Sequence, residues 1–367
     1  MGKKIGIFTF YANNYGANWQ AYALQKYIKL NHTEDVEVIN FKTEQHAKNN
    51  KSVFTLKSNN PIKQLIINIL TLFRYFSIKK KQRRFDNFRN TNISFSNERY
   101  TLVDDVMTSI KYKDIYITGS DQVFNIDNPY YKVYYLGFPK NKSKKVAYAA
   151  SFGTSTFDDV YTDKIKDLIQ DFDYLSCREE KGTEYLTRIS KKKAVHVLDP
   201  VFLLDKKEWL EIAHLPKEDK YIFVYDLNGG YDLLNLAYRI KEQTGYKIVC
   251  CTSMASKMYL KADKVLFSLG PAEVIGYINK AMYVVTDSFH GTAMALINDT
   301  KVVSYIALPK KAERLTSLMS KLGIEQQIVY KENIDTFNIK DIEFKEYKQI
   351  LGKELNISKE YIKEAVN

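Results

Sequence analysis

Short apolar runs alternate with amphipathic stretches along most of the chain. Continuous apolar runs such as residues 5–10 and 221–225 predict buried strands, and the amphipathic stretches between such runs predict helices. Strands buried on both faces that alternate with helices are typical of an open parallel sheet. Further strands are expected at 36–41, 114–119, 145–151, 174–177, 194–198, 247–251, 265–268, 283–286 and 302–306, and helices at 17–30, 271–280 and 291–297.

The alternation restarts near Lys220, which predicts a second unit of the same kind. A chain of 367 residues is long enough for two domains, at about 100–200 residues each. We therefore expect an α/β fold of two doubly wound Rossmann-like domains that face each other, at residues 1–205 and 219–330, with a helical C-terminal segment at 331–367. Ligands of such sheets bind at the carboxyl ends of the strands, so we expect the active site in the interdomain cleft.

The composition is that of an ordinary globular protein. Hydrophobic residues make up 45% and charged residues 27%, which excludes the disordered and fibrous classes. Three cysteines, two of them adjacent, favour a reducing cytoplasm over a disulfide framework. The sequence contains no run of about 20 apolar residues, and residues 1–18 do not resemble a signal peptide. We therefore expect a cytoplasmic protein without a spanning helix.

Most of the excess positive charge lies in one segment. The formal net charge is +12, and residues 42–90 hold twelve cations and two anions, a difference of +10. We interpret them as a basic insertion in the N-terminal domain, in which an apolar stretch at 65–76 precedes a basic cluster at 79–84. The segment is either a helix packed on the core with a solvated basic end, or a peripheral contact of residues 65–89 with an anionic inner membrane. No RNA-binding motif accompanies it, so we expect no nucleic-acid partner.

Two polar loops follow predicted strands of the first domain. The loop after the first strand carries Asn14 and Gly16 and lacks the three spaced glycines of a dinucleotide-binding loop. It is either a plain polar turn or a cleft loop that contacts a sugar or a phosphate. The second loop presents Ser120, Asp121 and Gln122 together. Asp121 is either a helix cap or a carboxylate that accepts a proton from a sugar hydroxyl.

An arginine and a histidine follow two further predicted strands. Arg178 comes directly after residues 174–177, where a guanidinium suits a phosphate or a carboxylate; the plain alternative is a structural ion pair. His290 lies in the first turn of the helix that follows Asp287 and Ser288. Helix N-termini attract anions, and an imidazole there adds charge or delivers a proton. We interpret this helix start as an anion site.

Three weaker candidates remain. Glu273 lies in the first turn of the helix predicted at 271–280, where an acid either stabilises the helix or serves a site. Arg314 is either a surface cation or an anion ligand. The pair Asp171 and Asp173 lies away from the predicted carboxyl ends and is interpreted as structural. We expect no metal site and no cofactor.

Five motifs in this order resemble those of the polysaccharide pyruvyl transferase family. Each is weak alone, and together they cover most of residues 1–330. They are Asn14-Tyr15-Gly16-Ala17 with Gln20-Ala21-Tyr22-Ala23-Leu24, Gly119-Ser120-Asp121-Gln122, Ser176-Cys177-Arg178-Glu179, Asp199-Pro200 and Asp287-Ser288-Phe289-His290-Gly291.

The resemblance implies a GT-B-like fold and a ketal-forming transfer of the pyruvyl group of phosphoenolpyruvate, as co-substrate, to a sugar of a bacterial capsule, exopolysaccharide or cell-wall precursor. We expect this acceptor to be linked to a polyprenyl diphosphate. We expect His290 and Asp121 to be catalytic. The expected donor-binding residues are Arg178, Arg314, Ser288, Gly291, Thr292 and Glu273, and the expected acceptor-binding residues are Asn14, Gly16, Ser120 and Gln122.

One position departs from the family pattern. Several members carry an arginine two residues before the histidine, where this chain has Ser288. Either Arg178 and Arg314 balance the charges of the donor, or the donor is held differently. Two alternatives remain: a nucleotide-sugar-dependent glycosyltransferase of the same architecture, and a non-catalytic binding protein for surface glycans, which the cysteine usage disfavours.

Overall fold

The computed structural model describes residues 2–42, 61–154, 156–157, 159–226, 230–252, 261–308, 312–339 and 344–367. For residues 61–70 and 159 it describes the backbone alone. Residues 43–60 of the predicted basic insertion lie outside this part of the chain.

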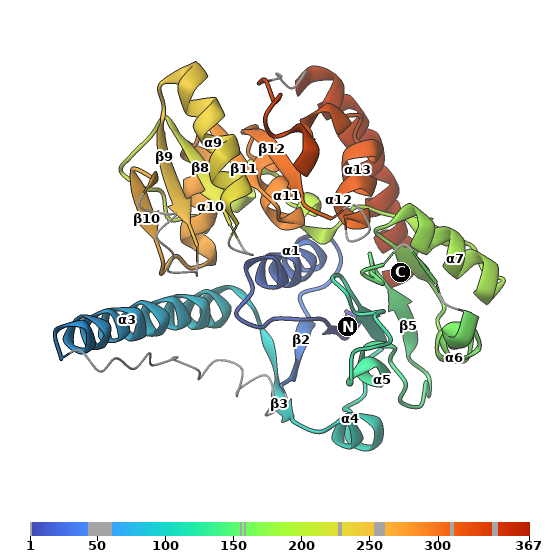
Figure 1. Ribbon diagram of the computed structural model, residues 1–367. Coiled ribbons are helices and arrows are strands. Elements are labelled where there is room, and N and C mark those ends of the chain that lie inside the picture. The colour runs from blue at the N-terminus through green and yellow to red at the C-terminus, as the bar shows by residue number, and fades with distance from the viewer. Residues whose placement is uncertain are drawn as a thin grey trace.

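A parallel sheet of five strands organises the first half of the chain (Figure 1). Its order is β3-β2-β1-β4-β5, and β1 pairs with β2 on one side and β4 on the other. The chain therefore leaves the centre of the sheet in both directions, and ligand loops open at such a switch point. The strands are β1 (Ile5–Phe8), β2 (Val36–Phe41), β3 (Phe95–Tyr100), β4 (Ile115–Thr118) and β5 (Lys144–Ala147).

A short parallel pair continues this layer. It consists of β6 (Leu175–Cys177) and β7 (Ala194–His196), and two single bridges, Val146 to Tyr174 and Ala150 to Cys177, connect it to the end of β5. The strand predicted at 145–151 ends at Ala147. The backbone turns away two residues later, because Ala149 has a φ of 48°.

The second half of the chain builds a parallel sheet of six strands in the order β10-β9-β8-β11-β12-β13. Its switch point lies between β8 and β11, which pair directly. Every residue of β8 and β11 is buried, as expected for strands covered on both faces. The strands are β8 (Tyr221–Tyr225), β9 (Lys247–Cys251), β10 (Lys264–Leu266), β11 (Tyr283–Thr286), β12 (Lys301–Ile306) and β13 (Ile328–Tyr330).

Helices connect and cover the strands of both sheets (Figure 1). They are α1 (Tyr15–Asn31), α3 (Pro61–Asn92), α4 (Val103–Ser109), α5 (Tyr131–Tyr134), α6 (Asp159–Ile169), α7 (Glu180–Ser190), α8 (Lys206–Glu211), α9 (Tyr231–Thr244), α10 (Pro271–Lys280), α11 (Phe289–Ile297), α12 (Glu313–Lys321) and α13 (Phe344–Val366), with short 3₁₀ turns at Pro200–Leu203, Glu325–Gln327 and Lys331–Asn333. The alternation of strands and helices thus confirms the predicted α/β class with two Rossmann-like domains.

Helix α1 lies between the two sheets (Figure 1). Tyr15 donates its hydroxyl hydrogen to the carbonyl of Leu269 at 2.8 Å, and the indole of Trp19 donates to the carbonyl of Pro271 at 3.3 Å. A single buried apolar cluster joins α1 to α10 and α11. The two domains therefore share one continuous core, which holds their facing edges together.

Helix α13 returns from the second domain to the first. The hydroxyl of Tyr361 donates to the carbonyl of Ala147 at 2.7 Å, and the amide of Leu198 donates to Ser358 Oγ at 2.9 Å. The side chains of Tyr361 and Ile362 are buried in the core. The helical C-terminal segment is therefore part of the packing of the N-terminal domain.

Helix α3 divides into a packed half and a projecting half. Phe85, Phe88 and Arg89 are buried, whereas Phe73 and Phe76 are 67% and 61% exposed. Figure 1 shows the helix extending away from both sheets. The interpretation as a helix packed on the core is therefore right for its C-terminal half. In the other half, the side chains of residues 72–76 are exposed.

Candidate active site

Loops from both sheets meet where the central strands end. Asn14 follows β1, Asp121 follows β4 and Arg178 follows β6, while Ser288 follows β11. Because the strands of each sheet are parallel, their carboxyl ends share one edge. The structure therefore brings together polar residues that lie far apart in the sequence.

The guanidinium of Arg178 is the centre of a buried ionic cluster. Its Nη1 donates to Asp199 Oδ2 at 2.7 Å, its Nη2 lies 3.3 Å from Asp121 Oδ1, and its Nε lies 3.3 Å from Glu179 Oε1. The Arg178 side chain is 1% exposed. Burial opposes the charge, but the carboxylates of Asp199, Glu179 and Asp121 outweigh it and raise the pKa of Arg178. Arg178 therefore stays charged and holds three acids in place.

Asp199 connects this cluster to the second domain. Its Oδ2 accepts hydrogen bonds from Ser120 Oγ at 2.9 Å and from Arg178, and it lies 3.6 Å from Nε2 of His290. Its Oδ1 accepts from the amide of Val201 at 3.1 Å, which caps a 3₁₀ turn. Burial would raise the pKa of Asp199, but His290, Arg178 and the Val201 amide together lower it. The carboxylate is therefore ionised in the folded protein.

Asp121 is held between two arginines. Its Oδ1 lies 3.3 Å from Arg178 Nη2 and 4.0 Å from Arg314 Nη1. The residue follows a cis Gly119–Ser120 peptide and has a φ of 69°, a region that non-glycine residues seldom occupy. Burial alone would raise the pKa of Asp121. The charges of Arg178, His290 and Arg314 together outweigh burial, so the pKa lies below its usual value. An ionised carboxylate is therefore presented at the end of β4.

His290 lies at the interface between the two domains. It is the second residue of α11, whose N-terminus is capped by Ser288 Oγ, which accepts from the amide of Gly291 at 3.2 Å. A methyl group at Gly16 would lie 2.0 Å from His290 Nδ1, so the imidazole covers the start of α1. The neighbouring Phe289 ring centroid lies 4.7 Å from the Arg178 guanidinium, a cation–π contact. Residues from both domains therefore fix the histidine ring.

Two pockets lie on either side of the ionic cluster. One, of about 350 Å³, belongs to the first domain and is lined by Asn14 and Asp121 among others. The other, of about 490 Å³, belongs to the second domain and is lined by Phe289 and Arg314 among others. Asp121 and Arg314, whose charged atoms lie 4.0 Å apart, thus connect the two pockets. Both pockets carry charges of both signs: Lys42 and Arg89 also line the first, and Asp226, Asp232 and Asp287 also line the second.

Arg89 of α3 supports the wall of the first pocket, and the sequence analysis did not identify it. Its Nη1 donates to the carbonyls of Tyr11 and Ala12 at 3.3 and 3.2 Å, and its Nη2 donates to Asn13 Oδ1 at 3.1 Å. Arg89 is buried, although the net charge made its segment look like a solvated basic surface. It fixes the loop after β1.

Four predicted site residues have other contacts. Thr292 Oγ1 lies 2.8 Å from Ser304 Oγ and faces β12, because a position two residues after His290 lies on the other side of a helix. The Gln122 side chain lies against Gly153. A methyl group at Gly291 would meet Tyr225 at 2.6 Å, so Gly291 serves close packing of α11 on β8. Thr292 and Gly291 therefore pack α11 on the sheet, and Gln122, Gly291 and Thr292 do not line either pocket.

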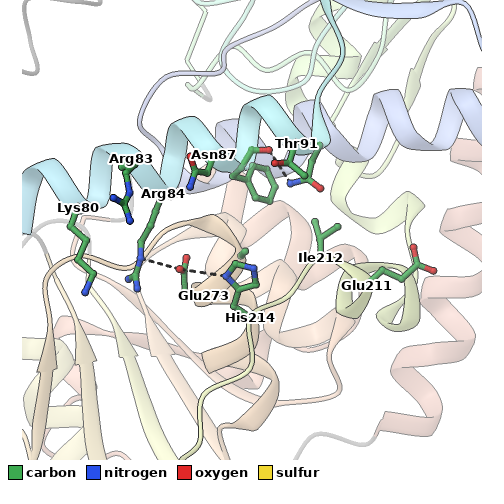
Figure 2. Close-up of a pocket in the computed structure, with 12 residues that line it drawn as sticks. Lys80, Arg83, Arg84, Asn87, Thr91, Glu211, Ile212, His214 and Glu273 are labelled. Carbon is green, nitrogen blue, oxygen red and sulfur yellow. Dashed lines mark hydrogen bonds and ion pairs between the residues drawn. The ribbon is translucent and has the colours of Figure 1, made fainter.

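Glu273 is the fourth, and it belongs to a different pocket. Its Oε2 accepts from the amide of Gly270 at 3.0 Å, and its Oε1 lies 3.0 Å from Nε of Arg84 and 3.5 Å from Nδ1 of His214. Figure 2 shows these three side chains in a pocket of about 550 Å³ between α3 and the second domain. Glu273 is therefore a helix-capping residue that also joins the domains.

Asp199 is the main residue whose role the sequence analysis missed. In the sequence it appeared only in the Asp199-Pro200 motif. The residues that it contacts, Arg178, Ser120 and His290, lie 21, 79 and 91 positions away. Its position after the strand predicted at 194–198, directly before a proline, was the available indication. Loop residues at that edge of a sheet are candidates for a site.

The fold is shared with a protein that was solved with UDP. The Staphylococcus aureus MnaA–UDP co-structure is 12% identical and has a TM-score of 0.50, and the alignment covers 98% of this chain and 90% of that one. At this identity the likeness shows the fold alone. The calicheamicin glycosyltransferase CalG4 (9% identical, TM-score 0.49, 98% and 96% covered) and the UDP-GlcNAc 2-epimerase of Methanocaldococcus jannaschii in complex with UDP-GlcNAc and UDP (14% identical, TM-score 0.46, 97% and 94% covered) are also similar.

Sequence comparison gives a more specific result. No curated protein sequence matches this chain. The family model for polysaccharide pyruvyl transferase matches residues 14–307, which include all five motifs and Asp121, Arg178, Asp199 and His290, while Arg314 lies beyond the match. In the described part of the chain, no helix is long and apolar enough to cross a membrane.

Proposed function

Since the chain belongs to the polysaccharide pyruvyl transferase family, we propose that this enzyme uses phosphoenolpyruvate to attach a pyruvate ketal to a sugar of a bacterial surface-polysaccharide precursor. The observation that carries the proposal is the joining of Asp121, Arg178, Asp199 and His290 across the domain interface. Asp121, which can accept a proton, and His290, which can deliver one, thus lie on the same buried ionic cluster, between two pockets. We place the enzyme in the cytoplasm.

The donor is proposed to bind on the side of the second domain. Phosphoenolpyruvate carries a phosphate and a carboxylate, which need two cationic places. Arg314 is 29% exposed and lines the 490 Å³ pocket, so its guanidinium is accessible to one anion. The N-terminus of α11 at Ser288–His290 attracts the other. Arg178 is buried among three carboxylates, so we assign it a positioning role: it offsets part of their charge and holds Asp121 and Asp199 in place.

The reaction is proposed to proceed in two additions. A sugar hydroxyl adds to C2 of the donor; Asp121 accepts the hydroxyl proton, and His290 delivers a proton to the methylene carbon, which becomes the methyl group. The bond between C2 and the phosphate oxygen then breaks and phosphate leaves. A second hydroxyl of the same sugar attacks C2 and passes its proton to the departing phosphate, and proton exchange with water returns Asp121 to the carboxylate and His290 to its protonated form. Two C–O bonds form, one C–O bond breaks, and the net products are the ketal and inorganic phosphate.

The acceptor is proposed to bind on the side of the first domain. Asn14 and Asp121 both line the 350 Å³ pocket, and Asn14 Oδ1 accepts from the amide of Ala17 at 3.1 Å, which fixes the loop. Ser120 supports this side indirectly through its bond to Asp199. We infer that the sugar is linked to a polyprenyl diphosphate at the inner leaflet, which would account for the net charge of +10 in residues 42–90.

The proposal is tested by incubating the enzyme with phosphoenolpyruvate and a panel of polyprenyl-diphosphate-linked and water-soluble sugars. The expected result is a product with the mass of a pyruvyl ketal and release of phosphate. The variant His290→Ala should lose about 100-fold or more in turnover, the effect of removing a general acid, whereas the control His32→Gln should keep it. Near-normal transfer by His290→Ala would show that His290 is not the acid.

A nucleotide-sugar glycosyltransferase is the rival, because the fold is shared with a protein solved with UDP. The two functions differ in the ligand that stabilises the folded protein. Protection from thermal unfolding by phosphoenolpyruvate, and not by UDP-sugars, is expected. The reverse result would replace the present proposal with a glycosyl transfer.

A further inference from the structure

The projecting half of α3 carries large apolar side chains that the two domains leave uncovered. Leu72 is 57% exposed, Phe73 67% and Phe76 61%. Lys79, Lys80 and Arg83 are also exposed on the same helix. We call these six residues the α3 surface, and we propose that it docks on a lipid bilayer that contains anionic phospholipid.

Helix periodicity places these residues on one side of α3. Positions 72, 76, 79 and 83 are three or four residues apart and fall in one stripe, and positions 73 and 80 flank it. The stripe is apolar far from the body of the protein and basic nearer to it. Single exposed apolar residues are common, but a contiguous group on a projecting helix marks an interaction surface.

The charge of the surface selects its partner. Residues 71–85 contain six basic residues and no acidic one. Aromatic and leucine side chains enter the boundary between headgroups and acyl chains, while lysine and arginine bind anionic headgroups. A second copy of this surface would bring like charges together. An anionic bilayer therefore matches both parts of the stripe.

The position of α3 relates this surface to the proposed reaction, on which this part of the inference rests. Its residues Lys80, Arg83 and Arg84 line the 550 Å³ pocket where the helix meets the second domain (Figure 2). Further along, Arg89 holds the loop of the acceptor-side pocket. Docking through the α3 surface would therefore bring the acceptor side close to a membrane that carries the lipid-linked sugar.

Vesicle co-sedimentation tests the docking directly. The full chain is mixed with vesicles of phosphatidylcholine alone, or of equal parts phosphatidylcholine and phosphatidylglycerol. Binding should be about tenfold or more stronger to the anionic vesicles and should weaken with salt. The variants Lys79→Glu/Lys80→Glu and Phe73→Ser/Phe76→Ser should each reduce that binding about tenfold or more.

Matched changes elsewhere serve as controls. Lys142→Glu/Lys217→Glu alters the charge equally at exposed sites, and Leu102→Ser/Ile357→Ser removes apolar side chains that are 62% and 45% exposed. Both controls should bind like the wild type. Equal binding to both vesicle types, or equal loss in control and α3 variants, would overturn the proposal. So would a dimer in solution that Phe73→Ser/Phe76→Ser abolishes, because the surface would then belong to a second copy.

A separate measurement distinguishes this proposal from the proposed function. Phe73→Ser/Phe76→Ser should transfer pyruvate to a water-soluble sugar at the wild-type rate and lose efficiency only with lipid-linked acceptor in vesicles. Loss of transfer to the soluble sugar as well would contradict a docking role for these side chains. Absence of transfer in the wild type with every acceptor would reject the proposed function and leave vesicle binding to decide the docking.

Discussion

The imidazole of His290 lies directly over Gly16, so a residue of the second domain closes over the first turn of the first domain's leading helix. A methyl group at Gly16 would come within 2.0 Å of Nδ1 and 2.4 Å of Cγ of that ring. On its other side, Nε2 of His290 lies 3.6 Å from Asp199 Oδ2. The histidine is therefore positioned by both domains at once, and the site depends on their contact.

Gly16→Ala should impair activity more than folding. The added methyl group has to push the His290 ring away from Asp199, and a displacement of about 1 Å at a catalytic group can cost on the order of 100-fold in rate. Turnover and thermal stability are measured side by side. The control is Gly352→Ala in α13, where a methyl group would meet no atom of the described residues within 4 Å. Unchanged turnover in Gly16→Ala would mean that the ring position is not required.

Asp199→Asn should destabilise the protein by about 3–5 kcal/mol, because it removes one partner of a buried ion pair and leaves Arg178 under-compensated. Urea denaturation measures the change. Asp335→Asn, at a side chain that is 97% exposed, should change stability by less than about 0.5 kcal/mol. A loss in Asp199→Asn no larger than that of the control would show that the ionic cluster contributes little to the fold.

Stability should fall on acidification because of His196. Burial and the charge of Lys321 lower the pKa of His196 from 6.5 to about 4, against a smaller opposing effect of its hydrogen bond to the carbonyl of Arg178. Between those pH values the unfolded chain binds a proton that the folded protein does not, so the free energy of unfolding decreases as pH falls. The slope from this one group is at most about 1.4 kcal/mol per pH unit.

His196→Gln provides the comparison for this pH effect. The variant should show a flatter dependence of the unfolding free energy between pH 6.5 and about 4 than the wild type. Below that range both proteins should lose stability together. There the carboxyls of Asp121 and Asp199, whose pKa values are lowered in the folded state, take up protons. Parallel curves for the two proteins would contradict the assignment to His196.

Thr292→Val should lower stability by about 1 kcal/mol without changing the KM for phosphoenolpyruvate. The Thr292 hydroxyl is bonded to Ser304 Oγ at 2.8 Å in the core, and valine keeps its shape without the hydrogen bond. Thr292→Ser, which keeps the hydroxyl, is the matched control. A large rise in KM in Thr292→Val alone would return Thr292 to the donor-binding residues that the sequence analysis proposed.

Periodicity in the sequence predicted the strands of the second domain well. The strands at 221–225, 247–251 and 283–286 have the bounds expected, because continuous apolar runs buried on both faces have few other solutions. The edge strands β3 and β13 were missed. Phe95–Tyr100 reads FSNERY, and several of its side chains are polar and exposed. It therefore contains no continuous apolar run from which a buried strand could be predicted.

The candidate site was predicted in part. Placement at strand ends brought Asp121, Arg178 and His290 into one group, and the structure places them around a common centre. The same reasoning could not tell that Glu273 turns to Arg84, because that contact depends on where α3 docks. It also could not identify Asp199, whose partners come from three distant segments. Pairing between domains is a property of the packed structure and leaves little trace in local sequence.

The return of α13 to the first domain has a consequence for how the protein is made. Its residues 358–361 complete contacts with Leu198 and Ala147, which are synthesised long before them. During translation, the apolar surface of the N-terminal domain that α13 covers therefore stays exposed until the whole second domain has emerged from the ribosome. The two halves mature together, and neither is expected to reach its native packing as a separately expressed fragment.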